Sequence, residues 1–128
     1  MASKSYSIKV EVKSRYLDDA SRPDRGVYAF SYRVTMENTG RIPAKLLGRR
    51  WVLTDGNGEV TEVVGEGVVG EFPYLRPGER FEYTSRATIA TPVGTMVGSY
   101  QMLGDDGVPF EVQIDPVRLV YLLSLIHI

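Results

Sequence analysis

Alternation of apolar and polar residues with a period of two runs through most of this chain. Between Tyr28 and Met36, Tyr, Phe, Tyr, Val and Met occupy every second position, and mostly polar residues lie between them. Successive side chains of a β-strand point to opposite faces, so this pattern is typical of a strand with one buried face. No segment repeats apolar residues at helical spacing over three turns. We therefore expect β-structure with almost no helix.

Further segments alternate in the same way, and residues that favour turns separate them. Clusters such as Asn38-Thr39-Gly40, Asp55-Gly56-Asn57-Gly58 and Asp105-Asp106-Gly107 supply the asparagine, aspartate and glycine that tight turns require. About seven strands joined in this way predict a sandwich or a small barrel, and we favour an antiparallel β-sandwich. The strands are expected at residues 6–12, 28–36, 46–54, 59–64, 81–89, 96–102 and 110–114.

Two local expectations follow from this pattern. Leu47, Trp51 and Leu53 share one face of the strand at 46–54. Pro116 ends the strand that begins at residue 110, because proline cannot donate to a ladder, and a last apolar stretch begins near Val117.

Length and charge limit the classes of function. The 128 residues contain no cysteine and can form one domain, residues 1–128, with its own core. Fifteen Lys and Arg against 16 Asp and Glu give a net charge of −1, so we expect no binding to nucleic acid or to an anionic membrane. The N-terminus lacks a signal-peptide pattern and no apolar run is long enough to span a bilayer. We therefore expect a cytoplasmic protein.

The residue types exclude the commonest catalytic centres. Nucleophilic catalysis of the Ser-His or Cys-His kind needs a base beside the nucleophile, and the chain has no Cys and a single His, His127. A tetrahedral zinc site needs four Cys, His or carboxylate ligands, and without thiols or a pair of histidines this chain offers only carboxylates. We predict no catalytic residue, no metal site and no cofactor.

One short motif fits a named pattern, since residues 65–70 (Gly-Glu-Gly-Val-Val-Gly) read G-x-G-x-x-G. In dinucleotide-binding folds a helix follows these glycines, but here Pro73 and Pro77 prevent a helix of useful length. Two interpretations remain. The glycines form an irregular connection between sheets, or their N–H groups bind pyrophosphate or a phosphorylated nucleotide. The residues of this anion site would be Gly65, Gly67, Gly70, Arg49 and Arg50, with Arg41 in a neighbouring segment.

The same region offers a surface for a protein partner. Arg and Trp are enriched at the centres of interfaces, and Arg49, Arg50 and Trp51 are consecutive. We therefore predict partner binding by these three residues together with the loop at 65–70.

Several ordered blocks resemble the bacterial ApaG family, also called CorD, over residues 4–120. The blocks include Tyr28-Ala29-Phe30-Ser31-Tyr32, Leu46-Leu47-Gly48-Arg49-Arg50-Trp51, Asp55-Gly56-Asn57-Gly58, Val63-Val64-Gly65-Glu66-Gly67-Val68-Val69-Gly70, Pro77-Gly78-Glu79, Tyr83-Thr84-Ser85, Thr91-Pro92-Val93-Gly94-Thr95-Met96 and Gly107-Val108-Pro109-Phe110. The resemblance implies a fibronectin type III-like or immunoglobulin-like sandwich. It also implies a genetic association with cobalt and magnesium homeostasis and with the gene of a diadenosine tetraphosphate hydrolase. A similar domain occurs in eukaryotic F-box proteins and in a DNA polymerase delta interacting protein, where a partner-binding role is natural.

Two functional hypotheses follow. The first is a non-enzymatic interaction module that binds a protein partner and is linked only indirectly to cobalt and magnesium homeostasis. The alternative is a small anion-binding protein that uses the 65–70 loop and nearby arginines. We expect a monomer or a homodimer, because an exposed edge strand allows pairing between copies.

The last residues form a separate case. Residues 123–128 resemble the translation of a transposase adapter used in preparing DNA libraries. We therefore treat residues 121–128 as an altered or artefactual tail and assign no role to His127.

Overall fold

The computed structural model describes residues 5–121, and these form eight strands and two short 3-10 helices. The expected tail beyond Tyr121, with His127, lies outside the described residues. No helix of the described part is long and apolar enough to cross a membrane. The elements are β1 (Ile8–Tyr16), η1 (Asp18–Ala20), η2 (Pro23–Arg25), β2 (Tyr28–Asn38), β3 (Ala44–Asp55), β4 (Val60–Glu66), β5 (Tyr74–Leu75), β6 (Arg80–Ile89), β7 (Val93–Gly104) and β8 (Pro109–Val120).

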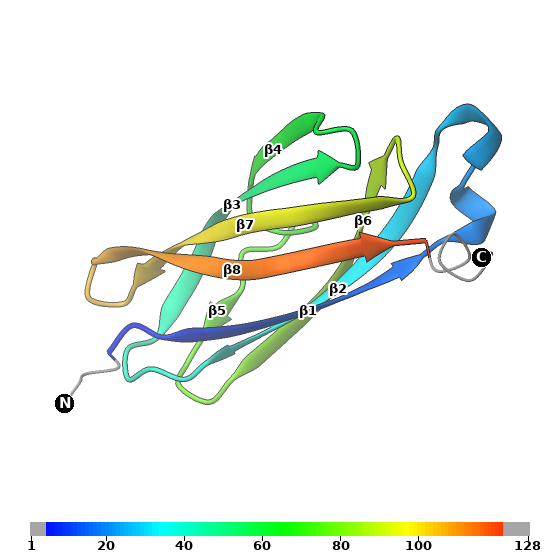
Figure 1. The fold of residues 1–128 in the computed structure, drawn as a ribbon. Helices are drawn as coiled ribbons and strands as arrows, with labels where there is room; N and C mark the ends of the chain where they lie inside the picture. Colours follow the sequence, from blue (N-terminus) through cyan, green and yellow to red (C-terminus); the bar gives the residue numbers. More distant parts are fainter. Residues whose placement is uncertain (1–4, 122–128) are drawn as a thin grey trace.

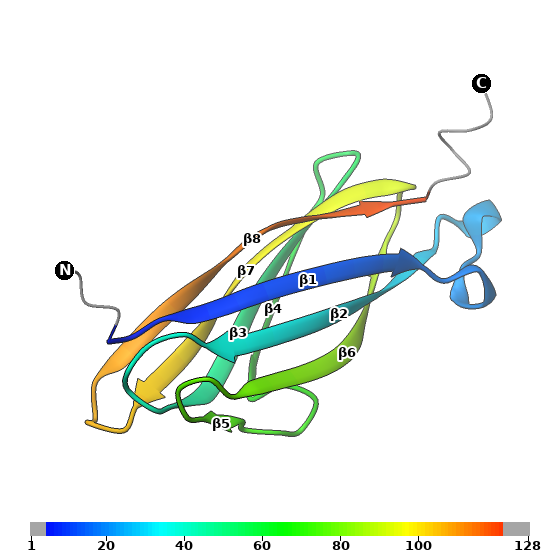
Figure 2. The ribbon, with the colours of Figure 1, turned by 90° about the horizontal axis from the view of Figure 1, so that it is seen from below.

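The strands form two antiparallel sheets that face each other, which confirms the predicted sandwich (Figure 1). One sheet has three strands in the order β1-β2-β6, and Figure 2 shows it from its own side. The other has the order β4-β3-β7-β8, with the short β5 also paired to β3. With β4 and β5 both paired to β3, this sheet has five strands, whereas the other has only three.

The expectation that Pro116 ends a strand is wrong. Met96 pairs with Val117 and Gly98 pairs with Ile114, so two residues of β8 stand opposite one residue of β7. Asp115 and Pro116 thus form a β-bulge, and the strand continues to Val120. Proline is tolerated there because β8 is an edge strand.

Leu47 does not lie on the face of Trp51, contrary to expectation. The register between β3 and β7 shifts between Leu46 and Gly48, which is a second β-bulge. One extra residue reverses the side-chain alternation, so Leu46 is fully buried while Leu47 is 39% exposed.

Trp51 lies at the centre of the core. Its indole is 2% exposed and makes edge-on contacts with the rings of Tyr32 and Tyr100. A Cβ on Gly98 would lie 2.6 Å from the Trp51 ring, so the indole packs directly on the β7 backbone. The indole N–H makes no hydrogen bond within the described residues. Apolar side chains from both sheets surround this group.

A pair of buried tyrosines joins the two sheets beside Trp51. The hydroxyl of Tyr83, on β6, and the hydroxyl of Tyr100, on β7, form a hydrogen bond. Burial raises the pKa of Tyr83 to about 12, although the hydrogen bond with Tyr100 opposes the rise. Burial raises the pKa of Tyr100 as well, and the neighbouring Tyr83 adds to the effect. Both hydroxyls therefore stay protonated at neutral pH.

This pair predicts a loss of stability in alkali. The Tyr83 pKa rises from 10.0 to about 12 on folding, so between these values the unfolded chain loses the proton first. The stabilisation is complete below pH 10 and declines as pH rises towards 12, by roughly 3 kcal/mol at most. Urea unfolding at pH 8, 10 and 11.5 measures this decline. The double variant Tyr83→Phe/Tyr100→Phe should decline less, and an equal decline in both proteins would contradict the assignment.

Candidate functional site

The glycine block, residues 65–70, begins at the end of β4. Its first residue, Gly65, pairs directly with Arg49 in the ladder between β3 and β4. A Cβ on Gly65 would lie 2.6 Å from Arg49 Nη1, so the guanidinium rests on the glycine backbone. The same nitrogen donates hydrogen bonds to the carbonyl oxygens of Glu66 (3.1 Å) and Gly67 (2.9 Å). Arg49 therefore holds the start of the block in place, and its Nη1 is directed at main-chain carbonyls.

Residues 67–72, which include the last four residues of the block, form a small loop that we call the flap. Val68 and Glu71 exchange two main-chain hydrogen bonds of 2.9 and 2.8 Å. Val69 and Gly70 form the tip, with φ values of 43° and 80°, as in a type I′ turn. Gly70 suits this geometry, whereas a β-branched residue such as Val69 is strained there. The tip is exposed.

Two contacts fasten the flap to the sandwich. The Gly67 N–H donates to the Leu47 carbonyl at 2.9 Å, and the Val68 side chain is fully buried in the core. A Cβ on Gly67 would lie 2.4 Å from the Glu71 carbonyl oxygen, so only glycine fits. The glycines therefore serve close packing and a tight turn.

The residues proposed for an anion site do not converge. Gly65, Gly67 and Arg49 lie together, but the Arg49 contacts described above are to carbonyl oxygens. Arg50 projects from the opposite face of β3, where it forms an ion pair with Glu62. Arg41 lies before β3, in its connection with β2. This arrangement provides no pocket in which arginine side chains surround a phosphate.

The partner-binding hypothesis needs one correction, because Trp51 is not at the surface. Alternation along β3 turns Arg50 outward and Trp51 inward, and only 2% of Trp51 is exposed. A buried Trp on the third strand is usual in immunoglobulin-like sandwiches. The resemblance to that fold was the signal that could have placed it in the core.

Strand β4 is the exposed element beside the block. It is the outermost strand of its sheet, at the upper edge in Figure 1, and none of its side chains is buried. Val60 and Val64, on one face, are 63% and 69% exposed, and Val63, on the other face, is 41% exposed. Across the flap, Val69 and Phe72 are 54% and 46% exposed. We call β4 with these two flap residues the β4 edge.

The free side of β4 carries main-chain groups that pair with no strand within residues 5–121. Main-chain bonds join Asp55 to Glu59 and Gly67 to Leu47, so the odd-numbered residues from 59 to 67 face β3. The N–H and C=O groups of Val60, Glu62 and Val64 therefore point away from the sheet, as does the Glu66 N–H. The Glu66 carbonyl is already bonded by Arg49. Sequence reasoning placed a strand at 59–64 but could not identify it as an uncovered edge, because the pairing partners of a strand are not visible in its own residues.

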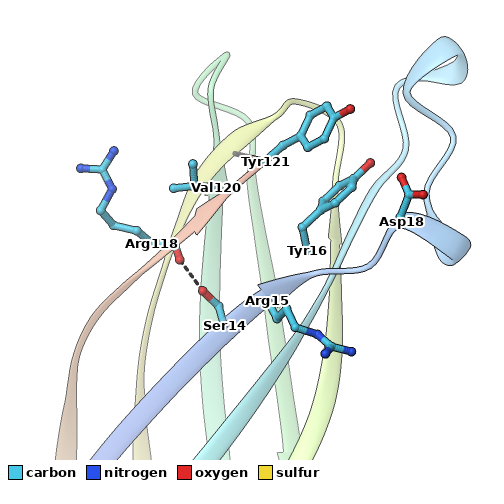
Figure 3. A pocket seen from close by; sticks show the side chains of 7 residues that line it. All are labelled: Ser14, Arg15, Tyr16, Asp18, Arg118, Val120 and Tyr121. Carbon is cyan, nitrogen blue, oxygen red and sulfur yellow. Dashed lines mark hydrogen bonds between the residues drawn. The ribbon is translucent and has the colours of Figure 1, made fainter. Parts of the chain in front are cut away.

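On the opposite side of the sandwich, β1 and β8 are in contact. Ser14 on β1 donates a hydrogen bond to the Arg118 carbonyl on β8 at 2.7 Å, and Tyr16 stacks on Tyr121 with ring centroids 4.3 Å apart (Figure 3). These contacts border a groove of about 510 Å³ lined by Ser14, Arg15, Tyr16, Asp18, Arg118, Val120 and Tyr121. Sequence reasoning did not predict this groove. The chain continues from it into residues outside the described range.

The described residues 5–121 contain no histidine or cysteine, and no group of three or more His, Cys, Asp or Glu among them is placed to hold a metal ion. The chemistry on offer at the β4 edge is therefore main-chain hydrogen bonding, apolar contact and carboxylate charge.

Comparisons with known proteins agree with one another. The family model described as the ApaG domain matches residues 18–104. The chain is 69% identical to Protein ApaG of Methylococcus capsulatus over 114 residues, which cover 89% of this chain and 90% of that protein. It is 51% identical to Protein ApaG of Escherichia coli over 118 residues, with 92% and 94% covered. A crystal structure of the ApaA protein of Bordetella pertussis superposes with a TM-score of 0.89 at 46% identity, covering 93% of this chain and 97% of that one.

The strained tip of the flap gives a stability prediction. Val69→Asn places a residue that tolerates positive φ before Gly70, so the free energy of unfolding should rise by about 1 kcal/mol. Urea unfolding measures the change. Val60→Asn is the control, since Val60 is also exposed but lies in extended β4, and this variant should not be stabilised. A Val69→Asn protein less stable than the parent would contradict the turn assignment.

Proposed function

Since the chain belongs to the ApaG-domain family, we propose that it is a non-enzymatic binding module that accepts an extended segment of a partner protein at the β4 edge. The observation that carries this proposal is the row of outward N–H and C=O groups at Val60, Glu62 and Val64, which the outward N–H of Glu66 continues. An extended peptide can pair with such a row and add a strand to the sheet, and nearby side chains then determine specificity.

The edge lacks most of the features that prevent strand pairing. Natural sheets protect their edges with proline, lysine, bulges or very short strands. β4 has seven residues, none of them Pro or Lys, and pairs with β3 without a register shift. Three exposed valines lie along it, Val60, Val63 and Val64. An edge of this kind supports a role in pairing with a partner.

The flap adds an apolar contact beside the edge. Val69 and Phe72 are about half exposed, and Lys45 lies 6.0 Å from the centre of the Phe72 ring. Large aromatic side chains contribute strongly to the contact energy where an interface buries them. Arg50, paired with Glu62, lies next to the edge on the outer face of the sheet. Arg49 holds the start of the flap in position through its hydrogen bonds to the carbonyl oxygens of Glu66 and Gly67.

The anion-binding alternative has less support. Arg49 donates to carbonyl oxygens, and Arg50 lies on the other face of its strand. We therefore propose the protein-binding role alone. We further propose that any contribution to cobalt and magnesium homeostasis is made through the bound partner.

A single proline substitution at the edge tests the proposal. The Val64 N–H points away from β3, so Val64→Pro keeps the internal ladder and removes one donor from the free side. Val64→Thr keeps the N–H and nearly the same shape. A protein captured from a bacterial lysate by the parent should bind the Thr variant similarly and the Pro variant about tenfold more weakly, as measured with purified components by calorimetry.

Matching urea unfolding curves for the two variants would establish that both are folded. If the captured protein bound the Pro and Thr variants with equal affinity, pairing at β4 would be excluded as the binding mode.

A further inference from the structure

The β4 edge is acidic as well as apolar. From residue 51 to residue 75 the chain has five carboxylates and no Lys or Arg. Only one of them, Glu62, has an ion pair among the described residues, and its partner is Arg50. Asp55 accepts the N–H groups of Asn57 and Glu59 within the turn before β4. The carboxylates are Asp55, Glu59, Glu62, Glu66 and Glu71.

The carboxylates alternate with valines along one face of the free edge. Val60, Glu62, Val64 and Glu66 share the outer face, and their N–H groups all point outward. A strand added beside them would place its own side chains directly opposite these four. The favourable neighbours are cations opposite Glu62 and Glu66 and apolar residues opposite Val60 and Val64.

A second copy of the chain fits this edge poorly. Two β4 strands in antiparallel contact would bring Glu62 and Glu66 of one copy close to those of the other, and among the described residues the ion pair with Arg50 offsets the charge of Glu62 alone. Like charges on neighbouring strands are destabilising, and acidic residues on an edge oppose pairing between copies. The charge that discourages self-pairing is complementary to a basic strand.

We propose that the segment accepted by the β4 edge is a basic β-strand, in which Lys or Arg alternates with apolar residues on one face. This inference rests on the proposed function, because it specifies the partner of the same edge. It assigns Glu66 and Glu62 as specificity-determining residues and Val60 and Val64 as their apolar complement.

Two synthetic peptides test the inference. One repeats the unit Thr-Arg-Thr-Val, and the other repeats Thr-Glu-Thr-Val. Titrated into the isotopically labelled full chain, the basic peptide should shift the amide resonances of residues 60–66, and the acidic peptide should not. Binding should weaken as salt rises from about 0.05 to about 0.5 M, because exposed charges are screened.

Glu66→Gln should weaken binding of the basic peptide by about two- to fivefold, the range for one cross-strand charge pair. Glu111→Gln is the matched control, because Glu111 is exposed on β8 at the other edge of the same sheet. This variant should bind the basic peptide with the same affinity as the parent. An equal loss in both variants would show a general charge effect and would overturn the assignment of Glu66.

The outcomes separate the two proposals. If both peptides shifted residues 60–66 with the same affinity, the basic preference would be wrong while strand pairing at β4 would stand. If the basic peptide shifted resonances elsewhere, or none, the basic-strand inference would be overturned, and the Val64→Pro comparison would still decide the proposed function. Concentration-dependent dimers that Val64→Pro abolishes would show that a second copy is the occupant and would also overturn the inference.

Discussion

The sheet of β1, β2 and β6 is narrower than the sheet that carries β4, β3, β7 and β8, and it cannot cover all of the wider sheet's inner face. At one margin β1 and β8 meet, joined by the Ser14 bond and the stacked rings of Tyr16 and Tyr121. At the other margin β4 extends beyond the core with every side chain at least partly exposed. The free edge is thus a consequence of how five strands and three strands pack together.

The glycine block and Arg49 hold that margin in shape. Gly65 allows the Arg49 guanidinium to lie on the backbone, and Arg49 then satisfies the carbonyls that β3 does not. The buried Val68 side chain anchors the flap in the core. In another fold a G-x-G-x-x-G motif that precedes a helix binds phosphate. Here no helix follows the motif, and its glycines form a tight connection after β4. The same packing leaves the outer side of β4 free.

Period-two alternation was sufficient to predict the sandwich and most strands. A strand with one buried face has apolar residues at every second position, so its own sequence identifies it. It failed where a single extra residue reversed the alternation, as at Leu47, and where an edge tolerated Pro116. Trp51 was misplaced because an Arg-Arg-Trp run has the composition of an interface, whereas strand geometry buries every second residue. The β4 edge could not be predicted, because the absence of a neighbouring strand is a property of the assembled sheet.

Amide hydrogen exchange along β4 tests the central claim most directly. In the free protein, Thr61, Val63 and Gly65 should be protected because their N–H groups face β3. Val60, Glu62, Val64 and Glu66 should exchange at rates near those of exposed loops. Uniform protection of all seven amides would show that another strand already covers this side, and uniformly fast exchange would show that β4 is not held in the sheet; either result would contradict an open, preformed edge.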